Sequence, residues 1–145
     1  MFKPLAIIPF NPNIPVPVQK YFRILILDDS GFDRLRIKRE ISKAGMNSEI
    51  DEISCLCQLQ NALNNERYDL VVIDYFLPDG TGEDAINVVL NHGINKSAKM
   101  LLVSGNPWVN EGLMKEESKR FYFLRKDKLG YGEILREIIA ADDGD

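Results

Sequence analysis

The 145-residue sequence lacks the marks of several large functional classes. Its uninterrupted apolar runs are only a few residues long, far short of the roughly 20 residues that span a bilayer. It has no excess of basic charge, because 18 Lys and Arg stand against 22 Asp and Glu, a net charge of −4. We therefore expect neither a membrane nor nucleic acid as a partner. No charged segment leading into an apolar stretch and a small-residue cleavage site opens the chain, which predicts a cytoplasmic protein.

Cysteine and histidine are also scarce. Cys55 and Cys57 lack the further partners of a zinc site and are too few for a disulfide framework. Because residues two apart point in different directions on a helix, we expect two reduced, partly buried thiols. The single histidine, His92, precedes Gly93 at a predicted helix end, which favours a helix-dipole partner over a catalyst.

Proline is concentrated at one end of the chain. Five of the seven prolines lie in residues 1–20, where they forbid a helix and most interior strands. This Pro-rich N-terminal extension is predicted to be a floppy leader or an arm whose apolar side chains lie on its own domain or on a neighbouring molecule. Residues 21–140 form the one predicted domain, with no internal repeat, and residues 141–145 form an acidic, solvated tail.

Short apolar runs alternate with amphipathic stretches from Tyr21 onward. Continuous apolar runs of this length are typical of strands covered on both faces, as in a parallel sheet. The alternation repeats five times, which predicts an α/β fold with a doubly wound sheet. The predicted strands are residues 23–27, 69–73, 100–103 and 121–124, with 48–53 as a weaker edge strand.

The helices between these strands have readable faces and ends. Leu56, Leu59 and Leu63 share one face of the second predicted helix. The third is predicted to start with a capping box at Thr81 and Asp84 and to end at Gly93, and Asn106-Pro107 begins the fourth. The apolar face of the last helix consists of Ile134, Leu135, Ile138 and Ile139.

A polar side chain follows the carboxyl end of each of the four strongest strands. Open parallel sheets bind ligands beyond the carboxyl ends of their strands. These residues are Asp28-Asp29, Asp74, Ser104 and Lys126. Three carboxylates within about 4 Å repel by about 4 kcal/mol per pair at an effective dielectric of 20, so such a cluster must bind a proton or a cation. An oxygen-only site with room for water suits Mg²⁺. Cation, hydroxyl and ammonium around one carboxylate favour phosphoryl transfer, with Asp74 as the nucleophile.

Four motifs in this order resemble the receiver domain of response regulators, the proteins of two-component signalling, over the stretch from Tyr21 to Ala140. The motifs are residues 24–30, 71–82, 101–105 and 123–126. The resemblance implies a flavodoxin-like fold with a five-stranded parallel sheet in the order 2-1-3-4-5. It also implies a phosphoacceptor signalling protein that assists its own phosphorylation and dephosphorylation, not a turnover enzyme. Asp74 would accept the phosphoryl group from a histidine kinase or a histidine phosphotransfer protein.

The resemblance also implies roles for the other motif residues. Asp29 would bind Mg²⁺ directly, Asp28 mainly through water, and the backbone carbonyl of Phe76 would complete the protein ligands. Ser104 would bond to the phosphoryl oxygens and Lys126 would form an ion pair with them. Arg125 and Lys128 are rival cations, but strand alternation and motif spacing favour Lys126. On phosphorylation Ser104 would move towards the phosphoryl group and Phe123 would turn into the vacated space.

Three positions depart from the family pattern without removing a catalytic group. Asp127 stands where proline is more common, Phe123 where tyrosine is frequent, and Phe76 where polar residues are frequent. Phe76 and Asn106 would flank the approach of the hydrolytic water. Phe76 cannot position a water and Asn106 is predicted to cap a helix, so we expect a long-lived phosphorylated form.

The resemblance does not indicate which protein the receiver acts on. We expect a stand-alone receiver that serves a phosphorelay or acts through contact with an unknown downstream protein, and a homodimer remains open. Trp108 is either a packing residue or an anchor for a partner. Two alternatives are a pseudo-receiver that is only an interaction scaffold, and an aspartate-nucleophile phosphatase. The adjacent pair Asp28-Asp29 differs from the D-x-D pattern of such phosphatases.

Overall fold

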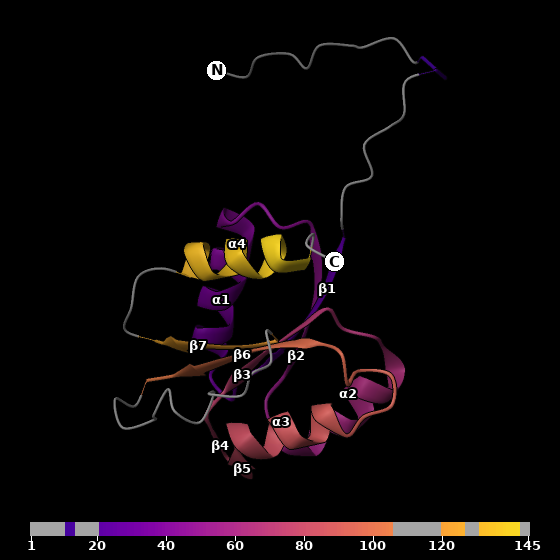
Figure 1. Ribbon diagram of the computed structural model, residues 1–145. Helices are drawn as coiled ribbons and strands as arrows, with labels where there is room; N and C mark the ends of the chain where they lie inside the picture. Colours follow the sequence, from indigo (N-terminus) through magenta and orange to yellow (C-terminus); the bar gives the residue numbers. More distant parts are fainter. Residues whose placement is uncertain (1–10, 14–20, 106–119, 127–130, 143–145) are drawn as a thin grey trace.

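The structure, a computed structural model, describes residues 11–13, 21–105, 120–126 and 131–142. Its centre is a parallel sheet with helices on both faces (Figure 1). The predicted fourth helix, with Asn106 and Trp108, lies outside the described residues, as do Asp127 and Lys128. Among the residues that are described, no helix is both long enough and apolar enough to cross a bilayer.

Five strands form the sheet, in the order β2-β1-β3-β6-β7. All four neighbouring pairs are parallel, so the predicted order 2-1-3-4-5 is confirmed. β2 lies at one edge and is partly exposed, as its polar alternation predicted. The strands are β1 (Phe22–Leu27), β2 (Ser48–Ile53), β3 (Leu70–Asp74), β6 (Lys99–Ser104) and β7 (Phe121–Arg125).

Helices cover both faces of this sheet (Figure 1). α1 (Gly31–Lys43) and α4 (Tyr131–Asp142) lie on one face, and α2 (Leu59–Asn65) and α3 (Gly82–Leu90) lie on the other. Successive side chains of a strand point to opposite faces, so β1 contributes Ile24 and Ile26 to one core cluster and Leu25 and Leu27 to the other. Full burial of each such side chain contributes about 1.5–3 kcal/mol. The central strands are thereby held firmly, together with the polar residues at their carboxyl ends.

Several helix ends differ from those predicted. The capping box at Thr81 and Asp84 is present, but α3 ends at Leu90 and not at Gly93. The turn that follows is closed by His92, whose Nδ1 accepts from the backbone N–H groups of Ile94 and Asn95. His92 is buried there and shapes this turn just beyond the end of α3.

Two short elements were not predicted. The second helix begins as a 3₁₀ turn, η1 (Leu56–Gln58), before α2. An antiparallel hairpin of β4 (Phe76–Leu77) and β5 (Gly80–Thr81) follows β3. At the other end of the chain, α4 continues to Asp142, two residues into the predicted tail.

Candidate functional site

The carboxyl ends of four parallel strands gather the predicted polar residues at one rim of the sheet. Asp74 ends β3, Ser104 ends β6, Asp28 follows β1 and Lys126 follows β7. The backbone N–H of Lys126 donates to the Ser104 carbonyl at 2.8 Å, which continues the β6–β7 ladder to this point. Asp28, Asp74 and Ser104 are all buried, at 1%, 7% and 0% exposure. These groups therefore face the interior of the rim, where water screens them weakly.

Three carboxylates converge at this rim. One oxygen of each of Asp28, Asp29 and Asp74 lies within 4.8 Å of the others, and Asp29 is exposed. The set consists of hard oxygen donors, and its exposed member gives access to solvent. Mg²⁺ is bound in proteins by a few carboxylates and keeps several waters. The residues present thus fit Mg²⁺.

Among the residues that the structure describes, Lys126 is the cation that pairs with the carboxylates of this site. Its Nζ lies 2.8 Å from Asp33 Oδ2, 3.2 Å from Asp28 Oδ2 and 3.4 Å from Asp74 Oδ1. Arg36 supports the same segment by donating from Nη2 to the Lys126 carbonyl at 3.5 Å. One ammonium therefore serves three carboxylates, and a fourth, Asp29, lies beside them.

Burial and mutual repulsion perturb the acid groups. Burial, with repulsion from Asp28, raises the pKa of Asp74 from 3.8 to about 6, against the pull of Lys126. Burial also raises the pKa of Asp28, although the Ser30 N–H and Lys126 act in the opposite direction. For Lys126, burial lowers the pKa, but the ion pairs with Asp33, Asp28 and Asp74 outweigh it and leave the pKa raised. The site is therefore short of positive charge, which is the condition for binding a cation.

The start of α1 orients Asp28. The N-cap Ser30 donates its N–H to Asp28 Oδ1 at 2.9 Å, and Arg34 Nη1 donates to the Asp28 carbonyl at 2.6 Å. Asp33, on the first turn of α1, was not predicted as a site residue. In the sequence it is an acidic residue three positions after an N-cap serine, which is an ordinary helix-start pattern. Only its distance to Lys126 distinguishes it.

The remaining predicted residues lie around this core. Phe123 is half-buried and packs against the cluster beneath α2 and α3. Phe76 is 51% exposed, and its ring meets the Tyr75 ring edge to face at 4.9 Å between centroids. The structure therefore places a half-exposed aromatic side chain two residues beyond Asp74. Asn106 lies outside the described residues.

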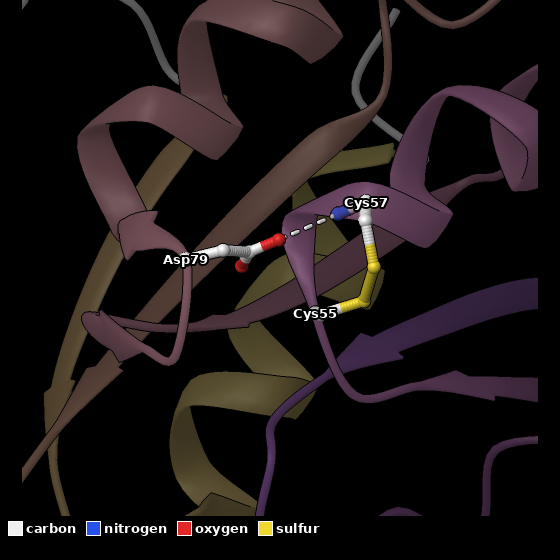
Figure 2. Close-up of side chains that lie close together, drawn as sticks. All are labelled: Cys55, Cys57 and Asp79. Carbon is white, nitrogen blue, oxygen red and sulfur yellow. Dashed lines mark hydrogen bonds between the residues drawn. A yellow bond between two sulfur atoms is a disulfide. The ribbon is translucent and has the colours of Figure 1, made fainter.

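The hairpin loop after Asp74 is tied to the start of η1. Asp79 accepts from the backbone N–H groups of Leu56 and Cys57, both at 2.9 Å. Gly80 belongs to the same contact, because a Cβ there would lie 2.3 Å from Leu56 Cδ1. Figure 2 shows the Asp79 carboxylate reaching the Cys57 amide from the neighbouring loop.

Cys55 and Cys57 form a disulfide, so the prediction of two reduced thiols was wrong (Figure 2). The prediction assumed helical geometry, in which residues two apart diverge. Cys55 is instead extended, at φ −150° and ψ 160°, and the 3₁₀ turn begins only after it. The change of direction leaves the two Cα atoms 5.2 Å apart, a separation that a disulfide spans.

Comparisons with known proteins identify the fold. No protein-family model and no curated protein sequence matches this chain. Among solved structures, a CheY-like response regulator receiver domain from Methylobacillus flagellatus has a TM-score of 0.65 and 21% identity, covering 82% of this chain and 99% of that chain. A receiver domain protein from Methanospirillum hungatei JF-1 has a TM-score of 0.63 and 20% identity, with 86% and 95% covered.

A third similar structure is the receiver domain of the sensor histidine kinase PA1611 from Pseudomonas aeruginosa PAO1. Its TM-score is 0.67 at 16% identity, covering 83% of this chain and 97% of that chain, and a magnesium ion is coordinated in its active-site cleft. At these identities the likeness establishes the fold. The chain therefore has the receiver fold, in agreement with the predicted α/β doubly wound sheet.

Proposed function

We propose that the protein is a phosphoacceptor receiver of two-component or phosphorelay signalling and that Asp74 is the residue that takes up the phosphoryl group. The observation that carries this proposal is the position of Asp74. It is a buried carboxylate at the end of the central strand, with oxygens of Asp28 and Asp29 within 4.8 Å and an ammonium 3.4 Å away. This arrangement supports a nucleophile whose product carries additional negative charge.

The transfer uses the side chains at the rim in distinct roles. An Asp74 carboxylate oxygen attacks phosphorus, the bond from phosphorus to the donor nitrogen of a phosphohistidine breaks, and the electron pair stays on that nitrogen. Asp28, Asp29 and Asp74, with the Phe76 carbonyl, would hold Mg²⁺, which supplies positive charge to the phosphoryl oxygens. Lys126 adds an ion pair from the side of β7, and the Ser104 hydroxyl donates to a phosphoryl oxygen. The donor is a histidine kinase or a histidine phosphotransfer protein.

The phosphoryl group would signal through Ser104 and Phe123. Ser104 is buried at the end of β6, and Phe123 lies on β7, where it is paired in register with Leu102. If Ser104 moves towards the phosphoryl group, Phe123 gains space to turn inward, and the surface available to a downstream protein changes. Phosphorylation biases the two states only through contacts that differ between them. An unchanged Phe123 rotamer with and without a phosphoryl mimic, measured by NMR, would contradict this route.

Intact-mass spectrometry after treatment with acetyl phosphate and Mg²⁺ tests the acceptor. We expect one added phosphoryl group on the wild type and none on Asp74→Asn. Asp51→Asn is the matched control, since Asp51 belongs to a different charged cluster and its variant should be phosphorylated normally. Normal phosphorylation of Asp74→Asn would overturn the assignment.

The same treatment separates the proposal from the two alternatives. A pseudo-receiver scaffold gives no added phosphoryl group, and an aspartate-nucleophile phosphatase releases phosphate continuously with multiple turnovers. Because Asp28, Asp74 and Lys126 are all present and in contact, the geometry supports a competent acceptor over a scaffold.

A further inference from the structure

The shortest ion pair of Lys126 is made with Asp33 and not with the acceptor carboxylate. Lys126 Nζ lies 2.8 Å from Asp33 Oδ2 and 3.4 Å from Asp74 Oδ1. We infer that Asp33 is a positioning residue that holds the Lys126 ammonium before phosphorylation and competes with the phosphoryl group for it. This inference rests on the proposed phosphoacceptor function and concerns how that function is regulated at the same site.

The carboxylate of Asp33 does not make the usual capping bond at the start of helix α1. Asp33 is at the third position of the helix, where an acidic side chain commonly caps the N–H of the N-cap residue. Here that N–H, from Ser30, is taken by Asp28 Oδ1 at 2.9 Å. The Ser30 hydroxyl accepts from the Asp33 backbone N–H at 3.2 Å, a bond that does not involve the Asp33 side chain. The Asp33 carboxylate instead contacts Lys126, whose Nζ donates a hydrogen bond to Asp33 Oδ2.

The charges at the site indicate whether Asp33 favours or opposes the phosphoryl-bound state. Before phosphorylation, the described part of the chain places the carboxyl groups of Asp28, Asp29, Asp33 and Asp74 near the one ammonium of Lys126. Phosphorylation replaces the single charge of Asp74 by a group with more negative charge, so the attraction of Lys126 to that position increases. Asp33 opposes the change in two ways. It attracts the ammonium away from the phosphoryl oxygens, and its own charge repels them.

Removing the Asp33 charge should therefore favour the phosphoryl-bound state. Lys126 already contacts Asp74, so its release from Asp33 stabilises the unphosphorylated carboxylate less than it stabilises a phosphoryl group of higher charge. Asp33 is partly exposed, with 24% of its side chain accessible, which reduces the effect through solvent screening. We expect a gain in affinity of about tenfold at most, equivalent to about 1.4 kcal/mol.

The test is a titration with beryllofluoride, a non-covalent phosphoryl mimic, at saturating Mg²⁺, followed by NMR of the backbone amides. Asp33→Asn should bind it several-fold more tightly than the wild type and take up phosphate faster from acetyl phosphate. Asp33→Glu, which keeps the charge, should return towards wild-type affinity. The matched control is Glu40→Gln, which removes a charge from α1 that pairs with Lys43 and not with Lys126. Its affinity should remain that of the wild type.

A double-mutant cycle with Lys126→Gln separates positioning from simple repulsion. If Asp33 acts through the ammonium, Asp33→Asn should improve beryllofluoride affinity clearly less in the Lys126→Gln background than in the wild type. An equal improvement in both backgrounds would overturn the positioning role, as would unchanged or weaker binding by Asp33→Asn. Thermal unfolding of each variant shows whether it is folded, and Asp33→Ser provides a second charge-free variant if Asp33→Asn is not.

Failure of this inference is distinguishable from failure of the proposed function. If the wild type binds no beryllofluoride, or Asp74→Asn binds it equally well, the phosphoacceptor proposal fails. If the wild type binds and Asp74→Asn does not, while Asp33→Asn matches the wild type, only the role of Asp33 fails.

Discussion

The two ends of β1 carry charged clusters with the same composition, one cation facing three carboxylates. At the carboxyl end, Lys126 contacts Asp28, Asp33 and Asp74. At the amino end, Arg23 contacts Glu49 at 2.6 Å, Asp51 at 2.9 Å and Glu66 at 3.3 Å. The clusters differ in exposure. The side chains of the three acids around Arg23 are 41–56% exposed, whereas those of Asp28 and Asp74 are 1% and 9% exposed.

Because of this difference in burial, the pKa values of acids in the two clusters are shifted in opposite directions. At the exposed cluster, the hydrogen bond and charge of Arg23 lower the pKa of Glu49. At the buried cluster, desolvation raises the pKa values of both Asp28 and Asp74 despite the nearby ammonium. A surplus of carboxylates is tolerated in water and is unfavourable where water is excluded. The Arg23 cluster is therefore suited to joining strands, and the Lys126 cluster to binding a cation and a phosphoryl group.

The largest expected contrast is in stability when each cation is removed. Lys126→Met should lower the free energy of unfolding by about 3 kcal/mol at pH 7 without Mg²⁺, because it leaves buried acids unpaired. The deficit should shrink at pH 5, where Asp74, whose pKa is raised to about 6, takes up a proton. Arg23→Met should lower the free energy of unfolding by no more than about 1 kcal/mol, since its partners are exposed. Urea unfolding in a chelator measures both, and equal losses would show that burial does not separate the clusters.

Removing the charge of Asp74 should instead raise the free energy of unfolding. The pKa of Asp74 is raised in the folded protein to about 6, against an ordinary value of 3.8. The folded state therefore binds the proton more tightly, and stability falls as the pH rises from about 4 through 6. Asp74→Asn removes this loss, so it should stabilise the metal-free protein at pH 7 by about 1–3 kcal/mol.

The advantage of Asp74→Asn should fade below pH 6 and be absent below about pH 4. Saturating Mg²⁺ should also reduce it, because the wild type gains the cation. Asp51→Asn, at the exposed cluster, is the control and should not stabilise the protein, since Asp51 accepts hydrogen bonds from Arg23 and Tyr68. A less stable Asp74→Asn at pH 7 would contradict the argument.

A smaller effect is expected on Mg²⁺ affinity. Asp29→Ala removes the exposed member of the Asp28, Asp29 and Asp74 set and should weaken Mg²⁺ binding about tenfold or more without loss of the fold. Glu49→Ala removes an acid of the exposed cluster and should leave Mg²⁺ affinity unchanged. Calorimetric titration gives both constants. If Asp29→Ala binds Mg²⁺ like the wild type, Asp29 is not a ligand.

The smallest effect concerns the lifetime of the phosphorylated form. Phe76 lies two residues beyond Asp74 and cannot hydrogen-bond to a hydrolytic water. Phe76→Asn should speed decay of the phosphorylated protein a few-fold, less than the hundredfold or so by which a well-placed donor acts elsewhere. Ile94→Asn replaces another exposed apolar side chain, away from the carboxyl rim, and should not change the decay. Equal decay of Phe76→Asn and the wild type would show that the ring does not shield the phosphate.

The fold was predictable because its signals are local and repeated. Each buried strand is an uninterrupted apolar run, and the residue after it marks the carboxyl rim, so the sequence indicated that Asp28, Asp74, Ser104 and Lys126 belong together. Asp33 was not predictable in this way. It lies on a helix, and its role depends on a lysine 93 residues away along the chain.

The hairpin after Asp74 and the Cys55–Cys57 disulfide were missed for a related reason. Two-residue strands have no periodicity to detect, and the hairpin is stabilised by one turn and by contacts with η1. The disulfide depends on a change from extended to 3₁₀ backbone within three residues, which spacing alone does not reveal.

The two hydrogen bonds between Asp79 and the start of η1 make it possible to observe the loop after Asp74 from another segment. The Leu56 and Cys57 amides donate to a carboxylate that belongs to the segment after Asp74. Their hydrogen exchange with solvent therefore reports on the opening of a loop to which they do not belong. Any rearrangement of residues 75–81 on phosphorylation that withdraws Asp79 should expose both amides together. The Leu56 and Cys57 amides, which lie between β2 and β3, can therefore be used in hydrogen-exchange experiments to follow the loop after β3.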